Sequence, residues 1–363
     1  MELSVLNSSF ETIGIIDIFE SLIWTERYSD AGEFEYYAPF TEADLELFHL
    51  GYYLSIAESE QIMIIEKIKI ETNVESGNHL VVSGRSLESL LDRRIIWVQT
   101  TVSGNVQNAI KKLITDNAIS PDNAHGGSDR IIPNLVFVSS TDASVTGLTM
   151  DSVQFTGDNL FEVVKSICDV FGLGFKITLS NGSMRFKLYN GANRSYTNLD
   201  GTSQTVNPWV IFSPEFESLI SSDYSLSTEN LKTVALVAGE GEGTDRKRSE
   251  IASGETSGLE RREVFVDARD ISSTDGEETI TDEEYTQLLQ TRGLETLATY
   301  ISETNFNTDM GNIIPYEYRT DFNLGDIVQI ENEYGLQSRA RITEFIFSEG
   351  SSGLECHPTF SAI

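Results

Sequence analysis

The sequence predicts an α+β fold that is mainly β, in which a small α/β insert separates two strand-rich regions. Short apolar segments with turn residues between them occupy residues 1–98 and return over 205–363. Residues 99–204 instead contain two stretches with the 3.6-residue period of amphipathic helices. A chain of 363 residues is also longer than one hydrophobic core usually serves, so we expect several domains.

The first region, residues 1–98, contains the clearest strand pattern. Phe34 and Tyr36 alternate with glutamates, which is the period of a half-buried strand. A turn at 29–32 joins this strand to the apolar segment before it and predicts a hairpin. Further strands are expected at 52–57, 61–72 and 79–84, followed by a short helix at 86–94. This spacing of short strands is typical of a small barrel or sandwich.

The second region, residues 99–204, is predicted to be an α/β insert. Ser103 or Asn105 can cap a helix whose apolar stripe is Val106, Ala109, Ile110, Leu113 and Ile114. A second helix is expected to begin near Asp158 and to stop at Gly172. Asn181 and Gly182 lie between two apolar runs, which is a strong signal for a β-hairpin.

The third region, residues 205–363, returns to strands. We expect strands at 218–228, 233–239, 263–267, 316–320, 326–330, 338–348 and 353–360. The stretch 239–258 is rich in Gly, Glu, Ser and Thr and is predicted to be an inserted loop or hairpin tip. Thr281 and Glu284 form a capping box that opens a predicted inserted helix over 281–302.

Acidic residues dominate the composition. Asp and Glu number 57 against 25 for Lys and Arg, a formal net charge of −32. Proteins bind nucleic acid largely through Lys and Arg that displace counterions from phosphates, so this chain should repel DNA. The surplus is explained either by solubility alone or by a surface to which other molecules do not stick.

The sequence carries few targeting or redox signals. It has no run of about 18 apolar residues, so no membrane span is expected. The start lacks the basic and apolar segments of a signal peptide. Cys168 and Cys356 lie far apart, and Cys168 falls on the apolar side of a predicted helix. We therefore expect Cys168 to be a buried free thiol, and we expect cytoplasmic synthesis rather than a disulfide framework.

No set of residues predicts a catalytic, cofactor-binding or metal site, and we predict that the chain is not an enzyme. Glu283 and Glu284 fit helix-start chemistry better than a glycosidase pair. Residues 267–270 and 275–278 only loosely resemble a calcium loop, and 239–243 lacks the Lys of a phosphate loop. The histidines are scattered at positions 49, 79, 125 and 357, without zinc-site spacing.

Three stretches together carry a family resemblance: residues 15–35, residues 82–94, and residues 322–328 followed by 341–344. In their order and spacing they resemble the siphophage tail hub family, also called tail-associated or baseplate hub proteins, of phages and prophages of Gram-positive bacteria. This resemblance implies two barrel-like tube domains with an inserted α/β domain, here 1–98, 205–363 and 99–204. It also implies a homotrimeric ring that continues the tail tube at the distal end of the virion and anchors the tip apparatus.

The resemblance implies partners and leaves other functions open. The expected partners are the distal tail protein, the tape-measure protein and other tail-tip proteins, with no stable membrane insertion. DNA would pass through the lumen without specific binding. From the net charge of −32 alone we further expect acidic residues to line the lumen, so that DNA slides through it. The chain ends soon after the last predicted strand, so we expect no appended hydrolase.

Two other functions compete with the hub. One is a tail-associated hydrolase that degrades peptidoglycan through acidic residues. The other is a carbohydrate-binding protein for host recognition that uses Trp97 or Trp209, although both tryptophans are more simply explained by core packing. Arg85, Arg93 and Arg94 could pair with carboxylates of a neighbouring subunit or of their own.

Overall fold

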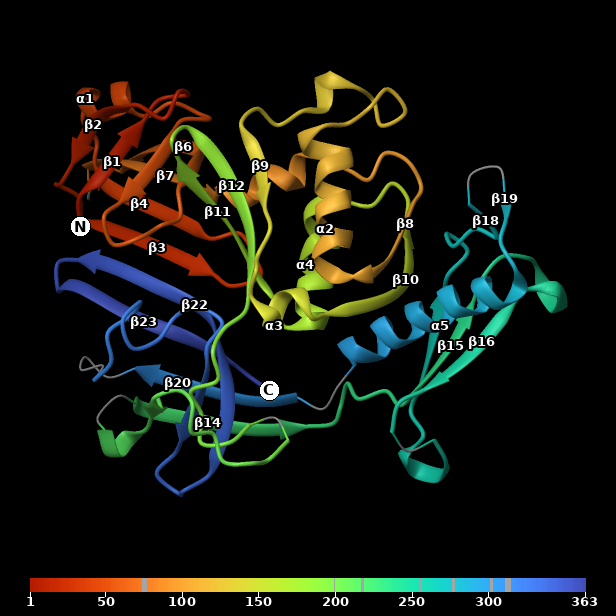
Figure 1. Cartoon of the computed structure of the whole chain (residues 1–363). Coiled ribbons are helices and arrows are strands. Elements are labelled where there is room, and N and C mark those ends of the chain that lie inside the picture. Colours follow the sequence, from red (N-terminus) through yellow and green to blue (C-terminus); the bar gives the residue numbers. More distant parts are fainter. Residues whose placement is uncertain are drawn as a thin grey trace.

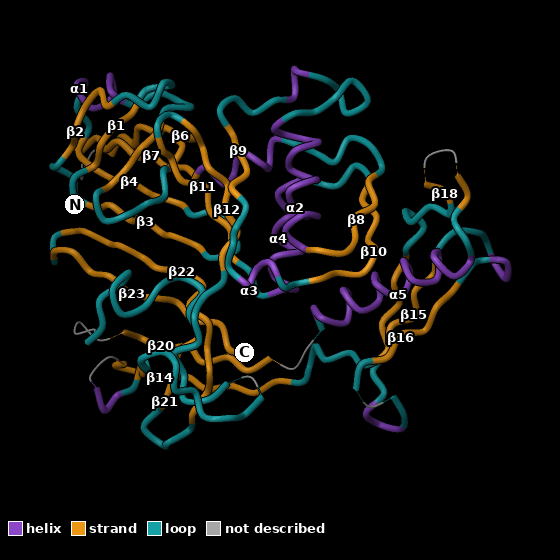
Figure 2. The backbone as a smooth tube through the Cα atoms, viewed as in Figure 1, coloured by secondary structure: helices purple, strands orange, loops and turns teal. Residues whose placement is uncertain are grey.

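The computed structural model describes the chain except residues 74–76, 199, 217–218, 255, 276–277, 301–302 and 311–314. Its described part is mainly β, which confirms the predicted class (Figure 2). None of the helices in that part is both long and apolar enough to cross a bilayer.

The first region folds into a run of antiparallel strands that ends in a short 3₁₀ helix. Its elements are β1 (Leu3–Leu6), β2 (Thr12–Ile16), β3 (Ser21–Arg27), β4 (Glu33–Pro39), α1 (Glu42–Leu47), β5 (Tyr53–Ile56), β6 (Met63–Asn73), β7 (Gly77–Ser86) and η1 (Leu87–Arg93). The order in the sheet is β3-β4-β7-β6-β5-β1-β2. The predicted hairpin is confirmed, because Trp24 of β3 lies opposite Phe34 of β4.

The insert contains two helices beside a small mixed sheet. Its elements are β8 (Thr100–Asn105), α2 (Val106–Ile114), the π-helical turn η2 (Thr115–Ile119), η3 (Ser128–Arg130), β9 (Leu135–Val138), α3 (Ala143–Thr146), β10 (Thr149–Phe155), α4 (Leu160–Phe171), β11 (Gly174–Ser180) and β12 (Ser183–Tyr189). Asn105 caps α2, and Gly172 ends α4 in the left-handed conformation, as predicted. The hairpin at Asn181 and Gly182 is confirmed, with positive φ at both residues.

Strands from both ends of the chain form one sheet (Figure 1). The C-terminal strands are β21 (Ile327–Glu331), β22 (Gln337–Gly350) and β23 (Gly353–Ala362), with β13 (Ile211–Phe212) beside β21 after the insert. β22 pairs with β3, so Phe347 lies opposite Trp24. Side chains of the first region and of the C-terminal strands share one hydrophobic cluster, so these two strand regions do not have separate cores.

A small module with its own core lies at the far side of the insert (Figure 1). It contains β15 (Val234–Ala238), η5 (Gly243–Asp245), β16 (Arg248–Ala252), η6 (Gly258–Glu260), β17 (Glu263–Asp267), β18 (Thr274–Asp275), β19 (Glu278–Thr279) and α5 (Asp282–Thr299). Between this module and the large sheet run η4 (Pro214–Phe216) and a two-stranded ladder of β14 (Leu219–Ser227) and β20 (Glu303–Met310).

Two predictions in the third region are wrong in whole or in part. The expected loop or hairpin tip over 239–258 is a hairpin tip only at 239–247, because the following residues form β16, which pairs with β15 and buries Ile251 in the core of the module. The predicted strand at 316–320 is a turn, since Arg319 has a φ of 69°. The capping box at Thr281 is confirmed and α5 ends at Thr299, while residues 301–302 of the predicted helix lie outside the described residues.

Candidate functional site

The region where the two strand regions meet the insert is held by three buried polar groups, on Tyr28, Asp326 and Glu26. We call this region the junction. It lies at the end of β3, beside the start of β11 and the turn before β21. Arg27 extends it, because its guanidinium bonds Glu344 of β22 at 2.7 Å and Glu33 of β4 at 2.6 Å.

Tyr28 is the centre of the junction. Its hydroxyl donates to the carbonyl of Gly172 at 2.9 Å and accepts from the amide of Gly191 at 3.3 Å. A Cβ at Gly174 or Gly325 would lie 2.3 Å or 2.1 Å from the Tyr28 ring, so both positions need glycine. Burial raises the pKa of the Tyr28 hydroxyl to about 12, so it acts as a neutral hydrogen-bond donor.

Asp326 ties the C-terminal strands to the chain that leaves the insert. Its carboxylate accepts from Arg194 Nε at 2.7 Å and from the amide of Ala192 at 2.7 Å. It also accepts from the amide of Asn323 at 3.0 Å, which closes the turn before β21. A buried carboxylate with three donors is satisfied, so Asp326 is well suited to fix the backbone around it.

Glu26, near the end of β3, is a second buried carboxylate that accepts several hydrogen bonds. Its carboxylate accepts from the Tyr318 hydroxyl at 2.5 Å, from Arg319 at 2.9 Å and from the hydroxyl of Ser59. The Tyr318 ring stacks on Phe345, with centroids 3.8 Å apart. Burial and the Glu26 carboxylate raise the pKa of Tyr318. These contacts hold the turn at Arg319 against the first region.

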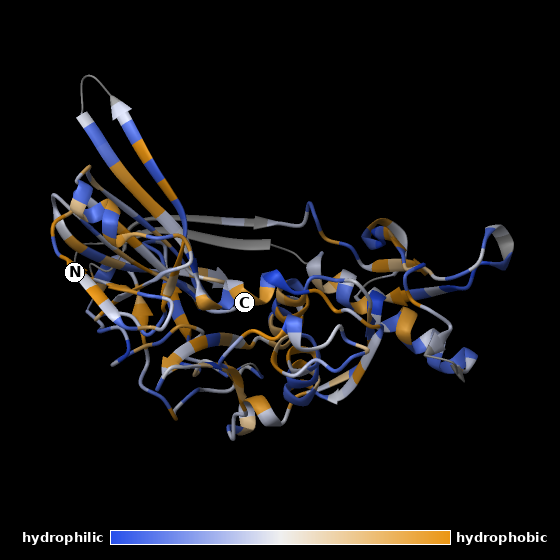
Figure 3. Cartoon of the chain, turned by 90° about the horizontal axis from the view of Figure 1, so that it is seen from above, coloured by the Kyte–Doolittle hydropathy of each residue, from blue (hydrophilic) through white to orange (hydrophobic). Residues whose placement is uncertain are grey.

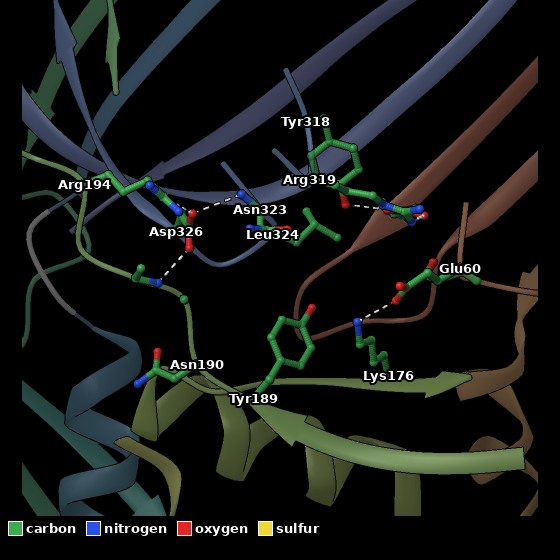
Figure 4. Close-up of a pocket in the computed structure, with 14 residues that line it drawn as sticks. Glu60, Lys176, Tyr189, Asn190, Arg194, Tyr318, Arg319, Asn323, Leu324 and Asp326 are labelled. Carbon is green, nitrogen blue, oxygen red and sulfur yellow. Dashed lines mark hydrogen bonds and ion pairs between the residues drawn. The ribbon is translucent and has the colours of Figure 1, made fainter. Parts of the chain in front are cut away.

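A cavity of about 420 Å³ opens between these groups (Figure 4). Ion pairs lie along its wall: Arg194 with Asp326, Arg319 with Glu26, and Lys176 with Glu60 at 2.8 Å. Because each of these carboxylates has a cationic partner on another segment, the ion pairs tie the walls of the cavity to one another. Among the described residues, no cluster of three His, Cys, Asp or Glu is arranged to hold a metal ion.

A second contact fixes the insert to the first region. The Ser86 amide donates to the Gly32 carbonyl at 2.9 Å, and the Gly32 amide donates to the Ser86 hydroxyl at 2.8 Å. Two residues later, the fully buried Glu88 accepts from the amide of Ile177 in β11 at 2.5 Å. Desolvation raises the pKa of Glu88 to about 7. The stretch at 82–94 therefore connects β7 to the insert.

The comparisons with known proteins identify the family. The family model described as siphovirus ReqiPepy6 Gp37-like protein matches residues 2–360. The chain belongs to this family. The expected membership of a siphophage protein family is therefore confirmed. No curated protein matches the chain in sequence.

Solved structures of tail proteins share the fold of this Gp37-like protein over its whole length. The 43 kDa tail protein of prophage MuSo2 from Shewanella oneidensis has 13% identity and a TM-score of 0.58, covering 100% of this chain and 98% of its own. The tail protein from Neisseria meningitidis MC58 has 13% identity and a TM-score of 0.57, covering 99% of this chain and 95% of its own. Prophage tail protein gp18 from Listeria monocytogenes EGD-e has 13% identity and a TM-score of 0.53, covering 99% of this chain and 94% of its own.

The three arginines considered for a subunit interface pair within their own chain in this Gp37-like protein. Arg85 bonds Glu66 through two nitrogens, at 2.9 and 3.1 Å, and also reaches Asp92 at 3.1 Å. Arg93 lies 3.8 Å from Glu66, and Arg94 bonds backbone carbonyls of the insert. The structure therefore favours the reading in which these side chains stabilise their own subunit.

The other residues singled out in the sequence do not converge on one site. Glu284 bonds Thr281 as the capping box requires. Cys168 is buried and free, as expected. Core packing is not the role of Trp97 or Trp209, because they are 55% and 50% exposed.

The residues of the junction were missed as a site in the sequence. Tyr28 lies in the stretch 15–35, and the turn before β21 lies in the stretch 322–328, but nothing in the spacing showed that the two meet. The one usable signal was the turn from Asn323 to Asp326, where Gly325 and Asp326 directly precede a predicted strand.

Proposed function

We propose that this Gp37-like tail protein is a structural hub at the distal end of the phage tail. In this proposal three copies form a ring that continues the tail tube and anchors the tip apparatus. Each copy contributes two barrel-like tube domains, from residues 1–98 and 205–363, which are joined by one sheet and one hydrophobic cluster, with residues 99–204 inserted between them. Its partners are the distal tail protein and the tape-measure protein, and it acts without catalysis.

One observation carries this proposal: strands from the two ends of the chain belong to one sheet through the pairing of β22 with β3. A ring subunit must transmit force between its tube segments without separating them. The buried groups of the junction support this task, because they join both strand regions to the insert. The whole-chain likeness in fold to prophage tail proteins supports it as well.

The mass of the purified full chain tests the ring. Light scattering should give a mass of about three times the 40.4 kDa of one chain. A persistent monomer would contradict a ring that assembles from this chain alone. Zymography on peptidoglycan tests the structural role, and clearing by the purified chain would favour a tail-associated hydrolase instead.

The net charge of −32 motivates one further part of the proposal. Acidic side chains line the lumen of the ring, so that DNA passes through it without binding. A map of the assembled ring tests this, since a neutral or basic lumen would contradict it.

Host recognition through carbohydrate is a second candidate function, and the exposure of two tryptophans favours it. The Arg130 guanidinium lies over the Trp97 ring, 4.8 Å from its centroid, and Trp209 packs edge-on against Tyr196. Exposed aromatic faces suit sugar rings. Binding of the chain to purified cell wall, lost in Trp97→Ala or Trp209→Ala, would support this function, and equal binding by both variants would contradict it.

A further inference from the structure

The last strand of the chain, β23, has no strand paired to its second edge in the described part of the molecule. β23 pairs only with β22, and β20, which passes close to it, pairs with β14 instead. β23 ends near the middle of the molecule (Figure 3), and its first half lies at the outer end of the β22–β23 hairpin (Figure 1). Alternate residues of an antiparallel strand turn their amide and carbonyl groups away from the paired strand. Such an edge is where an extended peptide can add to a sheet.

A hollow of about 690 Å³ follows the first half of this edge. Residues 352 and 354–357 form one of its walls. Its aromatic lining comes from the C-terminal region: Tyr316, Tyr318, Phe322, Phe345 and Phe347. Leu354 also lines it and is 46% exposed. We call this hollow the β23 groove. A peptide lying in it would combine backbone hydrogen bonds with the burial of apolar side chains.

Carboxylates dominate the charge of the β23 groove. Glu58 reaches it from the turn after β5, and Glu317 from the turn at 316–320. Glu355 lies on β23 itself, and its side chain points to the opposite face of the strand from Cys356. Arg319 lines the groove too, but its guanidinium bonds the buried Glu26 at 2.9 Å. The surplus of negative charge favours a cationic group in the groove.

Glu58 is the carboxylate that most needs such a cation. Its Oε2 is shielded from solvent and has no hydrogen-bond partner within the described residues. The carboxylate lies near the thiol of Cys356, whose pKa is raised to about 11 by burial and by the charge of Glu58. A desolvated carboxylate oxygen without a donor is costly, so a cation bound beside Glu58 would recover that cost.

We propose that the β23 groove binds an extended segment of a neighbouring tail protein that carries an arginine among apolar residues. The segment adds a strand to the free edge of β23, and its apolar side chain packs on the aromatic lining. Its arginine pairs with Glu58 and Glu317. Arginine suits the site because its planar guanidinium stacks on aromatic rings and bonds carboxylates. This inference goes beyond the proposed hub, because it assigns a docking surface and does not depend on the ring.

A peptide array tests the class of partner. The array holds short overlapping peptides that tile all tail proteins of the same phage, this chain included, and it is probed with the purified full chain. Bound peptides should come from another tail protein and carry arginine beside apolar residues. Replacing that arginine by glutamate should weaken binding at least about ten-fold. Binding of no peptide, of peptides without arginine, or of peptides from this chain alone overturns the proposal.

Variants of the chain test whether the peptide lies in the β23 groove. Glu58→Gln with Glu317→Gln should weaken binding about ten-fold. The matched control neutralises two exposed glutamates of α1, Glu42→Gln with Glu46→Gln, and should bind like the wild type. If the groove variant and the control bind equally well, the carboxylates of the groove do not hold the arginine.

A charge placed in the groove gives a second variant. Leu354→Arg brings a cation to the place that the peptide's arginine needs and should remove binding. Leu259→Arg, at a residue that is 97% exposed in the small module, should leave binding unchanged. Full binding by Leu354→Arg overturns the proposal.

The thiol of Cys356 reports occupancy of the groove without any substitution. Cys356 is partly exposed in the groove wall, whereas Cys168 is fully buried. N-ethylmaleimide at alkaline pH should therefore label Cys356 first. An array-selected peptide should slow this labelling about ten-fold once roughly nine-tenths of the chain is occupied. An unchanged labelling rate under that occupancy shows that the peptide binds elsewhere and overturns the proposal.

Discussion

The large sheet and the small module differ in how they are tied to the rest of the molecule. The large sheet is closed by long-range pairing and by the buried groups of the junction. The module has a three-stranded sheet with α5 packed on one face, while Leu236 and Phe265 are exposed on it. It contacts the insert through α5, which packs beside β10, and through two hydrogen bonds: Gln99 donates to the carbonyl of Thr274, and Gln154 accepts from the amide of Ser272.

This difference indicates two tasks within one chain. The proposed hub has to carry mechanical load, for which contacts between segments far apart in sequence are needed, and the junction provides such contacts. A module with its own core can unfold locally while the large sheet stays folded. We therefore expect substitutions in the junction to affect the whole fold, and substitutions in the module to remain local.

The largest effect is expected at Gly325. Gly325→Ala places a methyl group 2.1 Å from the Tyr28 ring at a φ of +86°, so the backbone or the ring must move. We expect a loss of about 4 kcal/mol in the free energy of unfolding, measured with urea. Gly335→Ala, at a φ of +73° in open space, is the matched control and should lose about 1 kcal/mol. Equal losses would contradict close packing at the junction.

A smaller loss is expected at Asp326. Asp326→Asn leaves the Arg194 guanidinium without its charged partner in a buried place, which should cost about 3 kcal/mol. Asp267→Asn removes an exposed partner of Arg246 and Arg269 in the module and should change the global transition little. If both substitutions lowered the midpoint of the main unfolding transition equally, the large sheet and the small module would not differ in their effect on global stability.

Glu88 makes the stability of the scaffold depend on pH. Burial raises its pKa from an ordinary 4.5 to about 7, so the folded state holds the proton more tightly than the unfolded state. This carboxyl therefore lowers stability progressively as the pH rises from about 4.5 to about 7, and it has no effect below that range. Glu88→Gln should gain roughly 3 kcal/mol over the wild type at pH 8 and almost nothing at pH 4.

Urea denaturation across this pH range measures the effect, and Glu46→Gln, an exposed glutamate on α1, is the control. The control should follow the pH profile of the wild type. If the stability of Glu88→Gln follows the wild-type pH profile too, the buried carboxyl of Glu88 is not the group that makes stability depend on pH.

The smallest effect is expected in the module. Thr281→Ala removes the capping box of α5 and should cost about 1 kcal/mol there. Hydrogen exchange should show faster exchange of α5 amides with an unchanged main unfolding transition. Thr41→Ala, which removes the cap of α1, should leave α5 unaffected. Loss of protection in the large sheet of Thr281→Ala would show that the module is coupled to the scaffold.

The sequence predicted local structure well because local rules decide it. Asn105, Gly172 and Thr281 mark helix ends through side-chain caps and a left-handed glycine, and the structure has them where expected. The strand β16 was missed because a short strand among glycines and charges carries no period. Ile251 is its one buried side chain, and pairing with β15 holds the rest of the strand.

The candidate site could not be predicted, because it depends on contacts between distant segments. Tyr28 meets Gly325 through the pairing of β22 with β3 and Gly172 through the packing of the insert, and no spacing in the sequence encodes either contact. The exposure of Trp97 and Trp209 was missed for a related reason. Large aromatic residues are usually buried, and only the surrounding fold decides the exception.

The position of the chain in the virion tests the central claim most directly. Electron microscopy of phage particles labelled with a gold-conjugated antibody against this chain should show label at the distal tip of the tail. Label along the tail shaft or at the junction of head and tail would contradict a hub.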